Sequence, residues 1–145
     1  MAAHHCRITS VAACAMLDHL VDLSDVGGAG QLIIYTGAEP AYCDDADGTE
    51  VATCTLPNPA FGAAAAHGVD DCQASLLSTA TDASATGNAS AVTYFRLANN
   101  GGTDFLQGTC SATAGDDLVL NTAVIANGSQ VDITALVLSL PFNQA

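Results

Sequence analysis

The chain has 145 residues, half of them hydrophobic, and its 15 acidic residues against two arginines and no lysine give a formal net charge of −13 at pH 7. Nucleic acids and anionic membrane surfaces are bound through clustered Lys and Arg, so this composition excludes both as partners. The length fits one domain over residues 1–145, and no apolar run approaches the roughly 18 residues of a membrane span.

A helix is predicted over residues 8–24. Apolar residues recur there at intervals of three and four and form one stripe, which consists of Ile8, Val11, Ala12, Met16, Leu20 and Leu23. Asp18, His19 and Asp22 fall on the other side, and the glycines of residues 24–30 end the helix.

Short β-rich segments separated by turn residues follow the helix. The expected strands are residues 31–37, 51–56, 72–78, 91–98, 103–110, 117–126 and 130–140. Asn127-Gly128 predicts a hairpin between the last two, and the alternation of the last strand changes phase near Thr134-Ala135, which indicates a bulge or burial of both faces. The alanine-rich segment 60–68 and the Ser/Thr-rich segment 78–91 are expected as loops or loosely ordered strand entries.

These segments predict an all-β fold: an antiparallel β-sandwich of jelly-roll or immunoglobulin-like type over residues 31–140, with about seven or eight strands and one N-terminal α-helix.

Six cysteines show no CxxC pair and no zinc-ribbon spacing, so metal binding through thiolates is not expected. Cys43 and Cys54 flank an acidic turn that contains Gly48, and a hairpin there would join them in a disulfide. The other four cysteines are interpreted as buried free thiols, with further disulfides as the alternative.

No cofactor, metal site or catalytic residue is predicted. The acidic residues of the segment 44–50 leave calcium binding open beside the preferred interpretation as a solvated hairpin tip. His4 and His5 show no coordination pattern, and His19 and His67 are expected at the surface. The chain lacks a Gly-x-Ser-x-Gly motif, so it is not expected to be an enzyme.

Arg7 and Arg96 are the only cations besides the histidines. In the expected strand 91–98, Arg96 shares a face with Val92 and Tyr94, so we expect it to reach solvent or an acidic partner. Both arginines are therefore candidate interface cations.

Several segments together resemble a family of small β-rich proteins encoded among the virion structural genes of tailed bacteriophages and prophages. The most specific are residues 34–37 with Pro40, residues 59–62, residues 95–97 and Leu120-Asn121, within a resemblance that spans residues 16–140.

The resemblance implies a capsid decoration, or cement, protein that is made in the cytoplasm of a host bacterium and binds the outside of the head shell. Its partners would be the major capsid protein and other copies of itself in a symmetric homo-oligomer. The alternative function is a tail-associated or host-recognition binding module, whose acidic loops hold calcium and contact a receptor or glycan.

Overall fold

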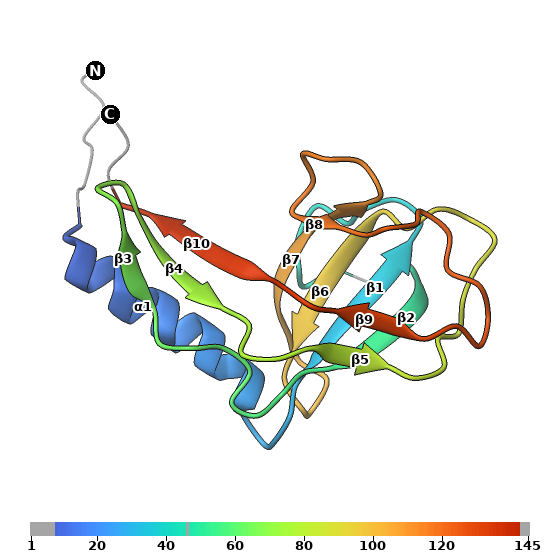
Figure 1. The fold of residues 1–145 in the computed structure, drawn as a ribbon, viewed down its shortest axis with the longest axis horizontal. Helices are drawn as coiled ribbons and strands as arrows, with labels where there is room; N and C mark the ends of the chain where they lie inside the picture. The colour runs from blue at the N-terminus through green and yellow to red at the C-terminus, as the bar shows by residue number, and fades with distance from the viewer. Residues whose placement is uncertain (1–7, 46, 143–145) are drawn as a thin grey trace.

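The computed structural model describes residues 8–45 and 47–142, and it is mostly β with one short helix (Figure 1). Helix α1 spans Ser10–Asp22 and continues into the 3₁₀ turn η1, Leu23–Asp25. Thr9 caps the helix, because its side chain accepts a hydrogen bond from the backbone N–H of Ala12 at 3.2 Å. The predicted helix is confirmed with slightly narrower bounds.

The predicted packing stripe of α1 is wrong. The helix buries Ala13, Leu17 and Val21, whereas Val11 and Met16 of the predicted stripe are 78% and 55% exposed. The helix is apolar on both sides, so periodicity alone did not identify the buried face. Ala13, Leu17 and Val21 lie in the core where α1 packs on the small sheet, so contact with this sheet determines which face of the helix is buried.

The described residues form ten strands in two sheets (Figure 1). The strands are β1 (Gln31–Thr36), β2 (Thr49–Thr55), β3 (Ala65–His67), β4 (Asp71–Ser75), β5 (Ala80–Asp82), β6 (Tyr94–Ala98), β7 (Asp104–Ser111), β8 (Leu118–Val119), β9 (Val131–Ile133) and β10 (Val137–Pro141). A curled seven-stranded sheet has the order β8-β7-β6-β1-β2-β5-β9, and a three-stranded sheet has the order β10-β4-β3. All pairings are antiparallel except the parallel pair β7–β8.

Five of the predicted strands are confirmed, with shifted ends, as β1, β2, β4, β6 and β7. The expected strand 130–140 is instead two strands, β9 in the large sheet and β10 in the small one. The change of phase near Thr134-Ala135 therefore marks the place where the chain passes between sheets. Of the segments expected to be loosely ordered, 60–68 contains β3 and 78–91 contains β5.

The turn at Asn127-Gly128 is present, but the predicted hairpin is wrong. Gly128 has φ 78°, and Ser129 N–H donates to the carbonyl of Ala126 at 3.1 Å. The turn is hydrogen-bonded to Ala85 rather than between two flanking strands, because Gly128 N–H donates to Ala85 and Ala85 N–H donates to Ser129. Only Leu118–Val119 of the expected strand 117–126 is extended into a strand.

One cluster of buried apolar side chains includes Leu17 of α1, Leu32 and Val51 of the large sheet, and Cys72 and Leu138 of the small sheet. Helix α1 lies along the small sheet (Figure 1). On the other face of β1 and β6, a second cluster contains Ile33, Tyr35, Tyr94 and Ala98. Among the described residues, no helix has the length and apolar character needed to cross a membrane.

Candidate functional site

Arg96 of β6 lies at the centre of a polar network on the outer face of the large sheet. The residue is 1% exposed, and its side chain donates hydrogen bonds to Asp104 of β7 (2.9 Å), Gln107 of β7 (3.0 Å) and the backbone carbonyl of Asp45 (3.1 Å). It also forms an ion pair with Asp47. One guanidinium therefore joins the connection between β1 and β2 to two strands of the sheet.

Neighbouring groups hold the same connection. The hydroxyl of Tyr94 accepts a hydrogen bond from Gly48 N–H at 2.6 Å, and the ring of Tyr94 stacks on that of Tyr35 with centroids 4.9 Å apart. Burial lowers the pKa of Arg96, but the hydrogen bond to Asp104 and the charges of Asp47 and Asp104 outweigh it, so the pKa is raised. The guanidinium stays charged and internally paired.

The prediction that Arg96 is an interface cation is wrong, because its partners are carboxylates of the same chain. Arg7 lies outside the described residues. Since the chain has no lysine, no Lys or Arg charge reaches solvent anywhere in residues 8–45 and 47–142.

Three of the four acidic side chains in the segment 44–50 make internal contacts. Asp47 pairs with Arg96, Asp45 accepts a hydrogen bond from Tyr42 N–H at 3.1 Å, and Glu50 accepts one from the Thr53 hydroxyl at 2.6 Å. Among the described residues, no group of three or more His, Cys, Asp or Glu is arranged to hold a metal ion.

The predicted disulfide between Cys43 and Cys54 is wrong, because both are free thiols. Cys43 lies near Arg96 in the connection that precedes Thr49, the first residue of β2. Cys54 lies five residues further along β2 than Thr49, which corresponds to about 16 Å of extended strand. A disulfide needs Cα atoms within about 7 Å.

The disulfide joins Cys14 of α1 to Cys72 of β4, with Cα atoms 5.3 Å apart. Cys110 is a buried free thiol, as expected, and Cys6 lies outside the described residues. The sequence missed this pair because its two members are 58 residues apart and meet only when α1 lies on the small sheet.

A cluster on the small sheet contains a serine, a histidine and an aspartate, the residue types of a hydrolase triad, but not in the order that catalysis requires. Asp71 accepts hydrogen bonds from Ser139 Oγ (2.6 Å) and Gln73 Nε2 (2.9 Å), and His67 Nδ1 lies 3.1 Å from its other oxygen. A catalytic triad places the histidine between serine and carboxylate, whereas here the carboxylate lies between them. The hydrogen bonds from Ser139 and Gln73 lower the pKa of Asp71, which makes it a weaker base.

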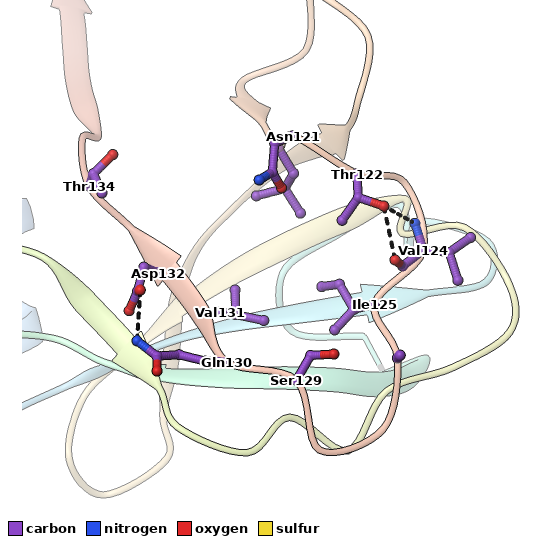
Figure 2. A pocket seen from close by; sticks show the side chains of 11 residues that line it. Asn121, Thr122, Val124, Ile125, Ser129, Gln130, Val131, Asp132 and Thr134 are labelled. Atoms are coloured by element: carbon purple, nitrogen blue, oxygen red, sulfur yellow. Dashed lines mark hydrogen bonds between the residues drawn. The ribbon is translucent and has the colours of Figure 1, made fainter.

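A cavity of about 620 Å³ opens between β9 and the segment 120–126 (Figure 2). Val131 and Ile125 extend toward its middle, Ser129 lies beside them, and Asn121 and Thr134 lie at its margin (Figure 2). No aromatic side chain lines it; its lining is Leu120, Asn121, Thr122, Val124, Ile125, Ala126, Ser129, Gln130, Val131, Asp132 and Thr134. Sequence reasoning missed this site, because it depends on the separation of β9 from β8 in space.

The outward face of α1 is a second candidate interaction surface. It carries Val11 and Met16; Ile8 (39% exposed) lies just before the helix, and Leu23 (41% exposed) lies just after it in η1. We call these four residues the outer face of α1. Val11 and Met16 are five positions apart, a helical rotation of about 140°, so these residues are spread over the solvent side of α1 rather than aligned in one stripe. Isolated exposed apolar residues are ordinary, but several on one solvent-facing side contribute apolar area to an interface.

Comparison of the chain with protein-family models, curated proteins and solved structures finds no match.

Proposed function

We propose that this protein is a capsid decoration protein of a tailed-phage or prophage virion, which binds the outside of the head shell and stabilises it. Its partners in this proposal are the major capsid protein and other copies of the chain in a symmetric homo-oligomer. We also propose that the fold is an antiparallel sandwich of jelly-roll or immunoglobulin-like type.

The observation that carries the proposal is the outer face of α1. Val11 is 78% exposed and Met16 is 55% exposed on a helix that the disulfide of Cys14 fixes to the small sheet. A helix held in this way presents its apolar side chains at little further cost in ordering, which favours docking against a second surface.

Charge indicates what kind of surface docks there. Carboxylates are the main charged groups of the described surface, because the one arginine of residues 8–45 and 47–142 is buried in internal ion pairs. The outer face of α1 is uncharged and docks best against an apolar area of the shell, while the carboxylates of the surrounding surface favour basic residues around that area. Acidic groups elsewhere keep displayed copies apart from each other.

The proposal is tested with purified heads that carry or lack the protein. Complete heads are expected to release their DNA at a higher temperature, and Val11→Asp is expected to lower the occupancy of the protein on the heads. Val119→Asp, at a half-exposed residue of β8, is the matched control and keeps full occupancy. Equal heat stability of heads with and without the protein contradicts the proposal.

The cavity beside β9 favours a second candidate function, a tail-associated or host-recognition binding module. Cavities of about 300–1,000 Å³ are the usual size for ligand sites. Immunogold labelling distinguishes the two functions, since a decoration protein is labelled over the whole head and a recognition module only at the tail tip.

A further inference from the structure

We propose that the cavity beside β9 binds an extended, positively charged peptide segment of a partner protein, which adds to the large sheet along β9. Peptide binding by the purified chain does not depend on either virion role.

The large sheet of the described residues has an open edge at β9. Strand β9 is the last strand in the described order of the large sheet, and its one neighbour is β5, in the register Ala80↔Ile133 to Asp82↔Val131. The opposite side of β9 faces the cavity (Figure 2). An edge strand presents unpaired backbone N–H and C=O groups, which an extended peptide satisfies by pairing with them.

The lining of the cavity suits an extended peptide. Ile125, Val131 and Leu120 supply an apolar floor, on which alternate side chains of an added strand can pack. The side chains of Asn121, Ser129 and Thr134 make no hydrogen bonds within the described residues and remain available to the peptide. The absence of aromatic side chains from the lining disfavours a sugar or nucleobase, since such rings bind by stacking on aromatic groups.

A carboxylate of β9 favours a positively charged peptide. Asp132 lies at the rim and is exposed, with its two oxygens accepting hydrogen bonds from Thr81 (2.7 Å) and Gln130 (2.8 Å). Both of these partners are uncharged, so no cation is paired with Asp132 within the described residues. A second copy of this chain has no exposed Lys or Arg in residues 8–45 and 47–142 that could pair with Asp132. A basic segment of another protein supplies such a cation.

The experiment is selection of binders to the purified protein from a phage-displayed library of random decapeptides. We expect enriched peptides to alternate small or aliphatic residues with polar ones and to carry at least one Lys or Arg. A synthetic copy of an enriched peptide is expected to slow hydrogen exchange at residues 131–134. Asp132→Asn is expected to weaken its binding about two- to fivefold, because exposed ion pairs contribute up to about 1 kcal/mol.

Ser129→Trp fills the cavity and is expected to abolish peptide binding, while Thr113→Trp, exposed and outside the cavity, is the matched control. Circular dichroism establishes that each variant is folded, and Asn121→Trp replaces Ser129→Trp if that variant unfolds. The proposal is overturned if no peptide is enriched, if enriched peptides lack a cation, or if cavity-filling variants bind them as well as the parent does. It is also overturned if light scattering shows that a second copy occupies the site, through a dimer that Ser129→Trp dissociates.

Discussion

Replacement of Arg96 by methionine tests whether the network on the outer face of the large sheet stabilises the fold. Methionine keeps the apolar stem but leaves Asp104, whose side chain is 18% exposed, and Gln107 without their donor. Each buried group that loses its partner costs about 1–3 kcal/mol. Asp47 is 48% exposed and regains contact with water, so the loss of its ion pair with Arg96 contributes at most about 1 kcal/mol. We expect Arg96→Met to lower the free energy of unfolding by about 3 kcal/mol, a large share of the usual 5–15 kcal/mol.

Urea unfolding followed by far-UV circular dichroism measures this loss, and hydrogen exchange reports on the connection between β1 and β2. That connection is expected to lose protection in Arg96→Met, because the guanidinium bonds to the carbonyl of Asp45 and pairs with Asp47. Asp47→Asn is the matched control and is expected to cost about 1 kcal/mol or less. A change below about 0.5 kcal/mol in Arg96→Met, with the connection still protected, would refute this reasoning and return Arg96 to the role of an interface residue.

Three further predictions concern other parts of the fold. Reduction of the Cys14–Cys72 disulfide is expected to lower the free energy of unfolding by about 4 kcal/mol, from the entropy of a 58-residue loop, and an unchanged melting temperature in reductant contradicts this. Burial raises the pKa of Cys54 and of Cys110 from 9.0 to about 12, so each thiol contributes stability that is full below pH 9 and falls as the pH rises toward 12. The expected loss is about 1 kcal/mol per thiol at pH 10, and replacing both by alanine should flatten the decline of urea stability between pH 9 and 11. Val11→Asp is expected to change the free energy of unfolding by less than about 0.5 kcal/mol, and a loss of several kcal/mol would show that the outer face of α1 is packed.

Local signals in the sequence predicted the elements of this fold better than their partners. Residues 31–36 form a strand because their apolar side chains favour burial in the centre of a sheet, and all but the first are buried. Asn127-Gly128 makes the turn that its residue types require, since glycine adopts positive φ without strain. These outcomes depend on a few neighbouring residues, which the sequence displays directly.

Contacts between distant segments decided the features that were mispredicted. Helix α1 has apolar residues on two sides, and only its docking on the small sheet selects Leu17 over Met16 as a buried residue. Arg96 alternates with core residues as a surface residue does, but the connection between β1 and β2 covers it. The cavity depends on where the segment 120–126 passes relative to β9, and no local motif encodes that distance.

The burial of Arg96 changes the meaning of the net charge of −13. A guanidinium at the surface would give each copy a site for the carboxylates of its neighbours, but here two carboxylates of the same chain already occupy it. The described surface is then negative without an exposed Lys or Arg, and copies repel each other over a distance of about 10 Å at 0.1 M salt. Self-association must therefore use uncharged patches such as the outer face of α1, and it should strengthen as salt screens the carboxylates. Binding of a basic partner should weaken as the salt concentration rises. Opposite salt dependences therefore distinguish contacts between copies from contacts with a partner.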